Sequence, residues 1–402
     1  MSLAEVPAVL ILLGVAAYLA LAGADFGAGF WDLTARAGAD RVRKHTHRAL
    51  APVWEANHVW LIFVLVVCWT AYPEAFGSIF STLAAPLLLA AIGIVLRGAS
   101  YAARSAGESP TASAVFSLSS IVTPFALGAA IGAIASGRVP TGNAAGGLFS
   151  SWLNPTSIAI GTLAVATSAY LAAVYLAGDA RRIGSPELLR AFRARALGAG
   201  VAAGILALAG IAVVAADAER LFDGLTQGAG LAAVIVSALG GVATLLLVAR
   251  GRYGPARFSA ALAVAAIVAG WGLAQAPELL PGLTIEEAAA GDATLVALLI
   301  GVAAGFVILV PSLALLFGLV LRGRFDAAAA AAAPTQRPAA ASAGRGRGRA
   351  VAVAGLIVLG VPLTLLADGV LFALGVVLML AFVAAAFALL VSPEALDQRD
   401  SG

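Results

Sequence analysis

The segment Ala51-Pro-Val-Trp-Glu-Ala-Asn-His-Val-Trp60 brings an acid, an amide, an imidazole and two indoles together within ten residues. Glu55 and His58 are three residues apart, so on a helix they share one face. A titratable pair at the edge of an apolar stretch can relay protons or hold a polar ligand. The neighbouring side chains are candidates to shape such a site: Trp54, Asn57 and Trp60. The alternative is an interfacial belt, with the indoles at headgroup depth and the acid favoured by the helix dipole.

Two further acids lie in the first apolar stretch, which contains Gly23-Ala-Asp-Phe-Gly-Ala-Gly29 and then Asp32. Asp25 and Asp32 are seven residues apart and therefore lie on one face of a helix. An acid inside a membrane span is a functional candidate by default, so Asp25 is a candidate for a proton or polar pathway. The alternative is a packing seam, in which the glycines let helices approach closely and the acid is hydrogen-bonded.

Two arginines and a tyrosine follow a later apolar stretch with helical spacing. Arg97, Tyr101 and Arg104 occupy positions i, i+4 and i+7, which places them on one helix face. Spacing alone favours ordinary anchoring at the cytoplasmic side, with an interfacial tyrosine. The other interpretation is that Arg97 lies at the level of Asp25 or Glu55, neutralises it and keeps it charged.

The elements that carry these residues must be membrane spans. The chain has 402 residues, of which 61% are hydrophobic and 11% charged, whereas a soluble domain carries about 25% charged residues. We therefore predict an all-α polytopic membrane protein. The single cysteine, Cys68, excludes disulfides within the chain and argues against a cysteine-ligated metal centre. The first apolar stretch, 6–22, lacks a basic n-region, so we expect a retained span and not a cleaved signal peptide.

A span needs roughly 20 apolar residues, and nine stretches before residue 323 meet this requirement. They lie at about 6–32, 52–72, 77–99, 112–136, 154–177, 196–216, 228–249, 257–275 and 294–321. These nine spans form the predicted core, 1–322. The loops between them alternate between basic and base-poor. Under the positive-inside rule, this alternation places the N-terminus outside and four basic loops in the cytoplasm: 36–48, 97–110, 178–195 and 250–257.

The C-terminal part of the sequence predicts an addition to this core. Residues 323–349 are rich in Ala, Pro, Arg and Gly, which is typical of a flexible cytoplasmic linker. The Arg-Gly repeat of this linker favours an anchor on anionic lipid over a nucleic-acid contact. The apolar block 350–391 is too long for one helix, and Pro362 and Asp368-Gly369 predict a break. We therefore expect a two-helix hairpin, eleven spans in all and a cytoplasmic tail at 392–402.

Few residues of this chain are suited to bind haem or a metal. Haem needs an axial His, Met, Cys or Tyr. The chain has three histidines and two methionines, and only His58 and Met379 lie in predicted spans. A protein that binds several haems is therefore not encoded here. No Walker loop or dinucleotide fingerprint is present in the sequence.

Five motifs, in order and with matching spacing, make residues 6–321 resemble subunit II of the cytochrome bd quinol oxidases. They are Gly23–Gly29, Ala51–Leu61, Ala71-Tyr-Pro73, Arg97-Gly98 with Arg104, and Asn154-Pro155. The resemblance implies a nine-helix subunit of a respiratory complex in the bacterial cytoplasmic membrane, which oxidises a quinol and reduces oxygen to water. It also implies that haem b and haem d lie in a partner of the same fold, subunit I, and that this chain binds no haem or metal through ligands of its own. The scarcity of histidine agrees with this expectation.

The resemblance implies roles for the candidate residues. Glu55 matches an acid on the family's proton path from the cytoplasm, and Asp25 matches its intramembrane aspartate. His58 stands where the family more often has Gln or Glu, and an imidazole can relay protons or tune Glu55. Three further residues match motif positions that shape the pocket: Trp54, Asn57 and Trp60.

The chain also departs from the family pattern. Ala22 stands where a first aspartate is common, and the acid often found between the matches to Arg97 and Arg104 is missing. A carboxylate entry to the proton path near these arginines is therefore in doubt. Water, Tyr101 or the partner subunit could supply the entry instead.

The implied partners are subunit I, quinone and membrane lipids, and no nucleic acid. A small accessory single-span subunit is a further candidate partner. The hairpin at 350–391 has no counterpart in the family pattern, and one hypothesis is that it replaces such an accessory subunit.

Two other functions stay open on the residues alone. One is a secondary transporter with a polar midplane site at Asp25, Glu55 and Arg97. The near absence of intramembrane charge in residues 196–391, apart from Asp368, argues against it. The other is an assembly scaffold that has no proton role.

Overall fold

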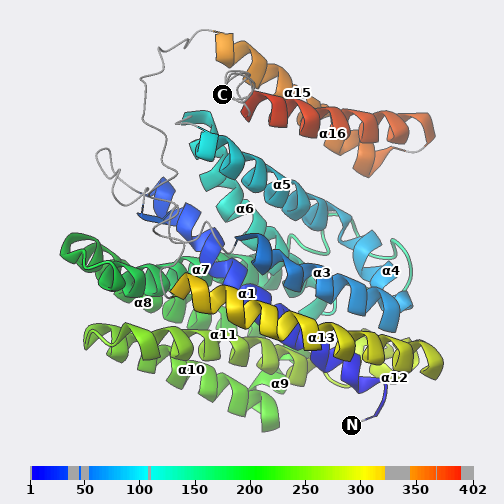
Figure 1. The fold of residues 1–402 in the computed structure, drawn as a ribbon. Coiled ribbons are helices and arrows are strands. Elements are labelled where there is room, and N and C mark those ends of the chain that lie inside the picture. Colours follow the sequence, from blue (N-terminus) through cyan, green and yellow to red (C-terminus); the bar gives the residue numbers. More distant parts are fainter. Residues whose placement is uncertain are drawn as a thin grey trace.

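The computed structural model describes residues 2–34, 45–46, 54–106, 110–321, 345–367 and 369–390, and nearly all of them are helical (Figure 1). The long helices are α1 (Glu5–Leu33), α3 (Trp54–Ala71), α5 (Ala84–Ala106), α6 (Pro110–Ala135), α7 (Pro155–Arg182), α8 (Pro186–Asp217), α10 (Gly228–Ala249), α11 (Tyr253–Gln275), α13 (Asp292–Leu321), α15 (Arg345–Leu366) and α16 (Gly369–Leu390). The short elements are α4 (Pro73–Thr82), α9 (Glu219–Thr226), α12 (Ile285–Ala288) and two antiparallel strands, β1 (Glu278–Leu280) and β2 (Leu283–Thr284).

The predicted all-α membrane fold is confirmed. Eight of the described helices are long and apolar enough to cross a membrane, namely α1, α5, α6, α7, α8, α10, α11 and α13. Shorter apolar stretches lie in α3, α15 and α16. Together these helices correspond to the eleven spans that the sequence predicts. The start of α7 is determined by its local sequence. Asn154 caps the helix by accepting a hydrogen bond from the Ser157 amide at 3.0 Å, and Pro155 takes the first helical position.

The predicted span at 77–99 is wrong in its boundaries, because the chain bends there. Helix α4 ends at Thr82, and Leu83 has φ −98° and ψ 23° before α5 begins. Pro86 explains the bend, since its ring cannot donate a hydrogen bond and would clash with the Thr82 carbonyl in a continuous helix. Helix α5 then runs on to Ala106, so the basic residues predicted to follow this span lie within the helix.

The C-terminal addition forms the predicted hairpin of two helices. Its break lies directly before Gly369, which has a positive φ of 57° that glycine adopts without strain. Pro362 lies inside α15 and not at the break. Helix α15 begins at Arg345, so the last residues of the predicted linker 323–349 are helical. The rest of that linker and the tail at 392–402 lie outside the described residues.

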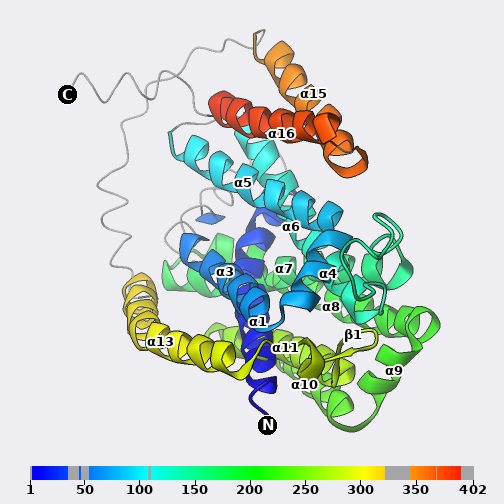
Figure 2. The same ribbon diagram turned by 90° about the vertical axis from the view of Figure 1, so that its right-hand side faces the viewer.

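The helices differ strongly in how deeply they are packed (Figure 2). In α6 and α7, 56% of the most apolar window is buried, whereas in α8 and α13 the share is only 6%. Helices α5, α6 and α7 are therefore the most buried, α11 and α1 follow with 39% and 28%, and α8, α10 and α13 lie at the surface of the bundle. The hairpin packs along α5, where Met379 and Phe382 contact Ile92.

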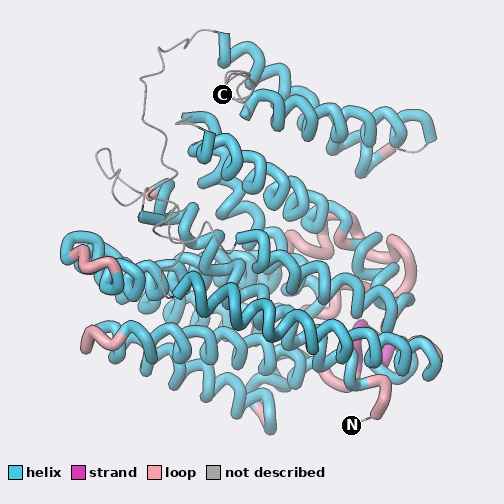
Figure 3. The backbone as a smooth tube through the Cα atoms, viewed as in Figure 1, coloured by secondary structure: helices cyan, strands magenta, loops and turns pink. Residues whose placement is uncertain are grey.

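Figure 3 shows that the loops lie at the two ends of the helices. The arginine-rich segments 178–195 and 250–257 lie at one of these ends. The first connects α7 to α8, and the second connects α10 to α11. We call this end the basic end. The strands β1 and β2 and the N-terminus lie at the opposite end (Figure 3).

Close contact between α1 and α7 fixes the position of the candidate residues on α1. A Cβ added at Gly27 would lie 1.8 Å from the backbone oxygen of Ser168, so only glycine fits there. Trp31 Nε1 donates to the Ala169 carbonyl at 2.8 Å in the same contact. The glycine-rich motif therefore presses one face of α1 on α7 and turns Asp25 towards α5.

Candidate functional site

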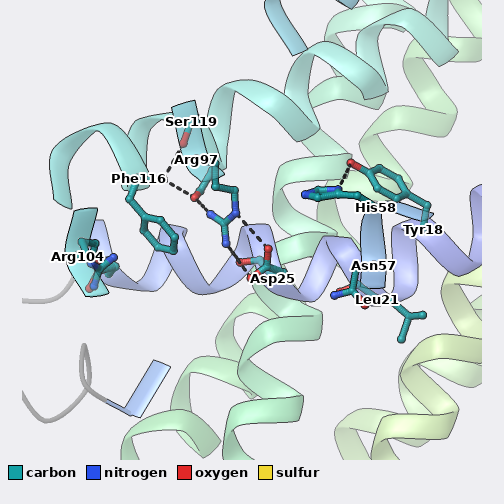
Figure 4. Close-up of polar contacts among 11 residues, drawn as sticks. Tyr18, Leu21, Asp25, Asn57, His58, Arg97, Arg104, Phe116 and Ser119 are labelled. Carbon is teal, nitrogen blue, oxygen red and sulfur yellow. Dashed lines mark hydrogen bonds and ion pairs between the residues drawn. The ribbon is translucent and has the colours of Figure 1, made fainter. Parts of the chain in front are cut away.

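A buried ion pair between α1 and α5 lies at the centre of the candidate site (Figure 4). Arg97 Nη2 lies 2.9 Å from Asp25 Oδ1, and Arg97 Nε donates to Asp25 Oδ2 at 3.1 Å. Arg97 Nη2 also donates to the backbone carbonyl of Asp25 at 2.6 Å. Both side chains are only 2% exposed. The guanidinium therefore holds the carboxylate with two parallel bonds, the geometry typical of a bidentate arginine–carboxylate pair.

Helix α6 completes the surroundings of this guanidinium. Arg97 Nη1 donates to the Ser120 hydroxyl, which donates its own proton to the Phe116 carbonyl at 2.5 Å. Gly29 leaves room for this contact, because a Cβ there would lie 2.0 Å from Ser120 Oγ. Three helices therefore meet around one arginine, and a glycine of the first motif makes their approach possible.

A second ion pair repeats the first one seven residues further along both helices. Arg104 Nη1 donates to Asp32 Oδ2 at 3.0 Å, and these side chains are 12% and 2% exposed. The Phe116 ring lies between the two arginines, with its centroid 4.2 Å from Arg97 Cζ and 4.5 Å from Arg104 Cζ. Both guanidinium groups are thus placed for a cation–π contact with one ring. The acidic face of α1 meets the basic face of α5 at both levels.

His58 lies on the other side of Asp25 along α1, in an aromatic pocket between α1 and α3 (Figure 4). Its Nδ1 lies 3.5 Å from the Tyr18 hydroxyl, and the tautomer of the ring decides which group donates. The His58 ring centroid is 5.9 Å from that of Tyr18 and 6.1 Å from that of Phe26. Asn57 Nδ2 donates to the Leu21 carbonyl at 3.3 Å. His58 and Asn57 are therefore both held against α1.

Two more predicted site residues border this arrangement. Trp60 packs against Phe306 of α13 and against the cluster of Tyr18, Ala22 and Phe26, and Tyr101 lies near Phe116 with ring centroids 6.3 Å apart. Trp54 and Glu55 begin α3, but their side chains lie outside the described residues. The helical backbone of α3 still puts residues 55 and 58 on one face.

Three contributors were not singled out from the sequence: Tyr18, Phe116 and Ser120. The signal for Ser120 was a run of hydroxyl residues, 117–123, inside the predicted span 112–136. Four of them are buried, namely Ser117, Ser119, Ser120 and Thr123. Such a run marks a polar face in an apolar helix but does not say which helix it meets.

Taken together, these side chains form a polar line along α1 from Asp32 to Tyr18. Its two aspartates and two arginines compensate each other, so the line carries fixed charges without a net charge. The exchangeable groups along it are the hydroxyls of Tyr18, Tyr101 and Ser120 and the imidazole of His58. Hydroxyl and imidazole groups can pass protons between waters, and fixed charges can orient those waters.

The described residues that could be axial ligands of a haem through His or Met are engaged in packing contacts. His58 lies between the Tyr18 and Phe26 rings, with centroids 5.9 and 6.1 Å from its own. His45 is buried against the Leu176 carbonyl, and Met379 packs into the contact between the hairpin and α5. Within the described part of the chain, no group of three His, Cys, Asp or Glu side chains could hold a metal ion.

A cleft of about 250 Å³ lies at the opposite end of the bundle, between α6, α8, α9 and β1. None of the predicted site residues lines it. Its most buried acid, Asp217, is bound by Arg138 at 2.6 Å and by the Thr156 hydroxyl at 2.7 Å. The cleft is therefore separate from the polar line on α1.

Comparisons with known proteins identify the family to which this fold belongs. The family model for cytochrome bd terminal oxidase subunit II matches residues 3–320, and the hairpin lies beyond it. A solved structure of a bd oxidase from Geobacillus thermodenitrificans matches with a TM-score of 0.67 and 26% sequence identity, over 80% of this chain and 99% of that chain. No curated protein matches the chain. Because the family model spans most of its length, the chain belongs to the cytochrome bd terminal oxidase subunit II family.

Proposed function

We propose that this chain is the haem-free subunit II of a respiratory quinol:oxygen oxidoreductase, and that it supplies protons to subunit I as well as holding it in place. Family membership implies a quinol oxidase complex with haems and a subunit I partner. The proposal adds that haem b and haem d are ligated in subunit I, and that the polar line on α1 is part of a proton path from the cytoplasm.

The observation that carries the proposal is the buried Asp25–Arg97–Ser120 contact, with the Asp32–Arg104 pair next to it. Charged groups inside a membrane span are costly, and they are kept where they serve a path or a site. The pairs lie in series along α1, seven residues apart, and both aspartates are almost fully buried, while Arg104 is 12% and Arg97 2% exposed. A series of this kind supports a route and not an isolated packing contact.

In the proposed path, each side chain has a limited task. The Glu55 carboxylate takes a proton near the cytoplasmic surface and passes it along α3 to His58, which shares its helix face. His58 exchanges a proton at Nδ1 with the Tyr18 hydroxyl, directly or through a water, since these atoms are 3.5 Å apart. Asp25 and Arg97 act as fixed charges that orient water between α1 and α5. Tyr101 offers a hydroxyl between Arg97 and Arg104, where the family often has an acid that this chain lacks.

The proposed path also needs a defined orientation of the chain in the membrane. We propose that the basic end faces the cytoplasm and the N-terminus the outside of a bacterial cytoplasmic membrane, because basic loops are retained on the cytoplasmic side. The Asp32–Arg104 pair then lies near the cytoplasmic surface, where protons would enter.

The test is the Glu55→Gln variant of the complete complex. Glutamine keeps the shape of the side chain but cannot carry a proton. We expect oxygen consumption per haem to fall at least roughly tenfold, as for removal of a proton-transfer group, while the b- and d-type optical spectrum stays unchanged. Glu286→Gln is the matched control, because this acid is exposed at the opposite end.

The outcomes of this test distinguish a proton path from a scaffold and from a role of Glu55 in assembly. Normal turnover of Glu55→Gln in an intact complex would contradict the proton path. A scaffold without a proton role predicts that result. Loss of haem from the complex would instead show that Glu55 is needed for assembly.

A secondary transporter is the weaker candidate function. Asp25 and Arg97 bind each other with two bonds, and the cleft found in the described part of the chain lies at the opposite end. The family also favours the oxidase.

A further inference from the structure

The basic end has a strong and poorly compensated positive charge. Its two segments, 178–195 and 250–257, contain eight arginines against the acids Asp179 and Glu187. Six of the arginines are exposed, namely Arg181, Arg182, Arg190, Arg193, Arg250 and Arg252. Asp179 is engaged by Arg182 at 2.8 Å. This surface therefore attracts anions.

Several of these arginines are held in place by backbone carbonyls and not by acids. Arg193 Nη2 donates to the Ala249 carbonyl at 2.5 Å, and Arg181 donates to the Gly251 carbonyl. Both guanidinium groups thus converge from α8 and α7 on the last turn of α10 and the loop after it. A bond to a neutral carbonyl fixes the position of a guanidinium but leaves its charge and its other N–H groups available.

Two more arginines lie deeper beside this point. Arg257 Nη2 donates to the Tyr175 carbonyl at 2.6 Å, and Arg195 lies over the rings of Trp31 and Phe192 at 5.4 and 5.1 Å. Arg257 Nε and Arg195 Nη1 are buried and have no hydrogen-bond partner in the described part of the protein. Their charges add to the positive potential behind the exposed arginines.

Exposed apolar side chains lie within roughly two helical turns of these arginines along the same helices. Phe258 follows Arg257 and is 80% exposed, Val201 on α8 is 52% exposed and Leu246 on α10 is 48% exposed. Helices α8 and α10 are also among the least packed of the spans, with 6% and 17% of their apolar windows buried. A bound molecule that meets both surfaces must combine an anionic group with long apolar chains.

We propose that the basic end binds an anionic phospholipid at the ends of α7, α8 and α10. The phosphate lies on Arg181 and Arg193, whose forked guanidinium groups match phosphate oxygens. The acyl chains lie along the exposed sides of α8 and α10. Basic pockets between membrane helices hold anionic head groups in this way. The site is distinct from the proposed proton path, so either proposal can fail without the other.

The test measures lipid binding to the intact complex by native mass spectrometry. Phosphatidylglycerol and phosphatidylcholine with the same acyl chains are titrated onto the unchanged protein and onto Arg181→Gln/Arg193→Gln. We expect the double variant to lose about 25-fold in apparent affinity for phosphatidylglycerol, since each arginine near a membrane surface contributes about a factor of five. Binding of phosphatidylcholine should stay unchanged.

Two controls guard against a general effect on the fold. Arg220→Gln removes an arginine at the opposite end, and it should bind phosphatidylglycerol like the unchanged protein. Arg181→Lys/Arg193→Lys keeps the charges and should stay within a few-fold of it. Equal binding of both lipids, a glutamine variant that binds normally, or a lysine variant that falls as far as the glutamine variant would each overturn the proposal. Competition by millimolar inorganic phosphate would assign the site to free phosphate and would also overturn it.

Discussion

Replacing Arg97 by glutamine tests whether the central ion pair is held as tightly as its geometry indicates. Asp25 is 2% exposed and receives two side-chain bonds from this one guanidinium. Removing one partner of a buried pair typically costs about 3–5 kcal/mol, because the other charge stays buried and uncompensated. At about 1.4 kcal/mol per factor of ten, the unfolding equilibrium constant should rise roughly 100- to 4,000-fold.

The double variant Asp25→Asn/Arg97→Gln shows how much of the lost stability comes from the uncompensated charge and how much from the changed side-chain shape. It removes both charges and leaves two amides of similar size, so most of the lost stability should return. The interaction energy from the double-mutant cycle should be at least about 2 kcal/mol. Arg104→Gln is the matched control, and its cost should be smaller because that arginine is 12% exposed and nearer to water.

The assay is unfolding of the purified complex over a graded series of SDS concentrations, followed by tryptophan fluorescence. The reasoning would be refuted by an Arg97→Gln variant as stable as the unchanged protein. It would also be refuted by a double variant whose loss is the sum of the two single losses, because additive losses mean that the two side chains do not interact.

Three further predictions concern other parts of the chain. Gly27→Ala should lower the free energy of unfolding by about 1–3 kcal/mol or more, because the added Cβ would lie 1.8 Å from a carbonyl oxygen of α7. Gly198→Ala is the control and should be tolerated, because that position on α8 is open. Thermal unfolding of the two variants measures the difference. Arg220 holds the pKa of Glu278 below its ordinary 4.5, so this pair should stabilise the protein above that pH and lose its effect as the pH falls through the lower folded value. Glu278→Gln should remove that pH dependence of the melting temperature. Deleting residues 323–402 should lower the melting temperature of the complex but leave its haem spectrum, because the family match ends at residue 320.

The membrane spans could be predicted because the bilayer imposes a length and a composition on each of them. The expected spans at 6–32 and 112–136 differ from α1 and α6 by only one or two residues at each end. The span at 77–99 failed because hydropathy does not register the bend at Leu83. A proline inside an apolar run, such as Pro86, is a local steric signal, and it has to be considered separately from the length of the run.

Spacing predicted which residues share a helix face, but not which faces meet. Seven-residue spacing puts Asp25 and Asp32 on one face of α1, and the same spacing puts Arg97 and Arg104 on one face of α5. Spacing alone favoured interfacial anchoring for the two arginines, whereas the structure pairs Arg97 with Asp25 and Arg104 with Asp32. The cost of leaving charges unpaired in a membrane favours this arrangement. Ser120 could not be found in this way, because serine is tolerated in many membrane helices and its partner depends on how α6 packs.

The hairpin acts on the same helix that carries both arginines. Leu88, Ile92 and Leu96 of α5 face α15 and α16, while Arg97 and Arg104 on the adjacent face meet α1. Lipid chains are as apolar as these leucines, so the hairpin gains little by covering them from lipid, and its contacts act through packing. Helices α15 and α16 therefore support α5 next to the face that carries its ion pairs with α1, and no described side chain of the hairpin joins the polar line. An extension beyond the family match thus contacts the helix that holds both arginines.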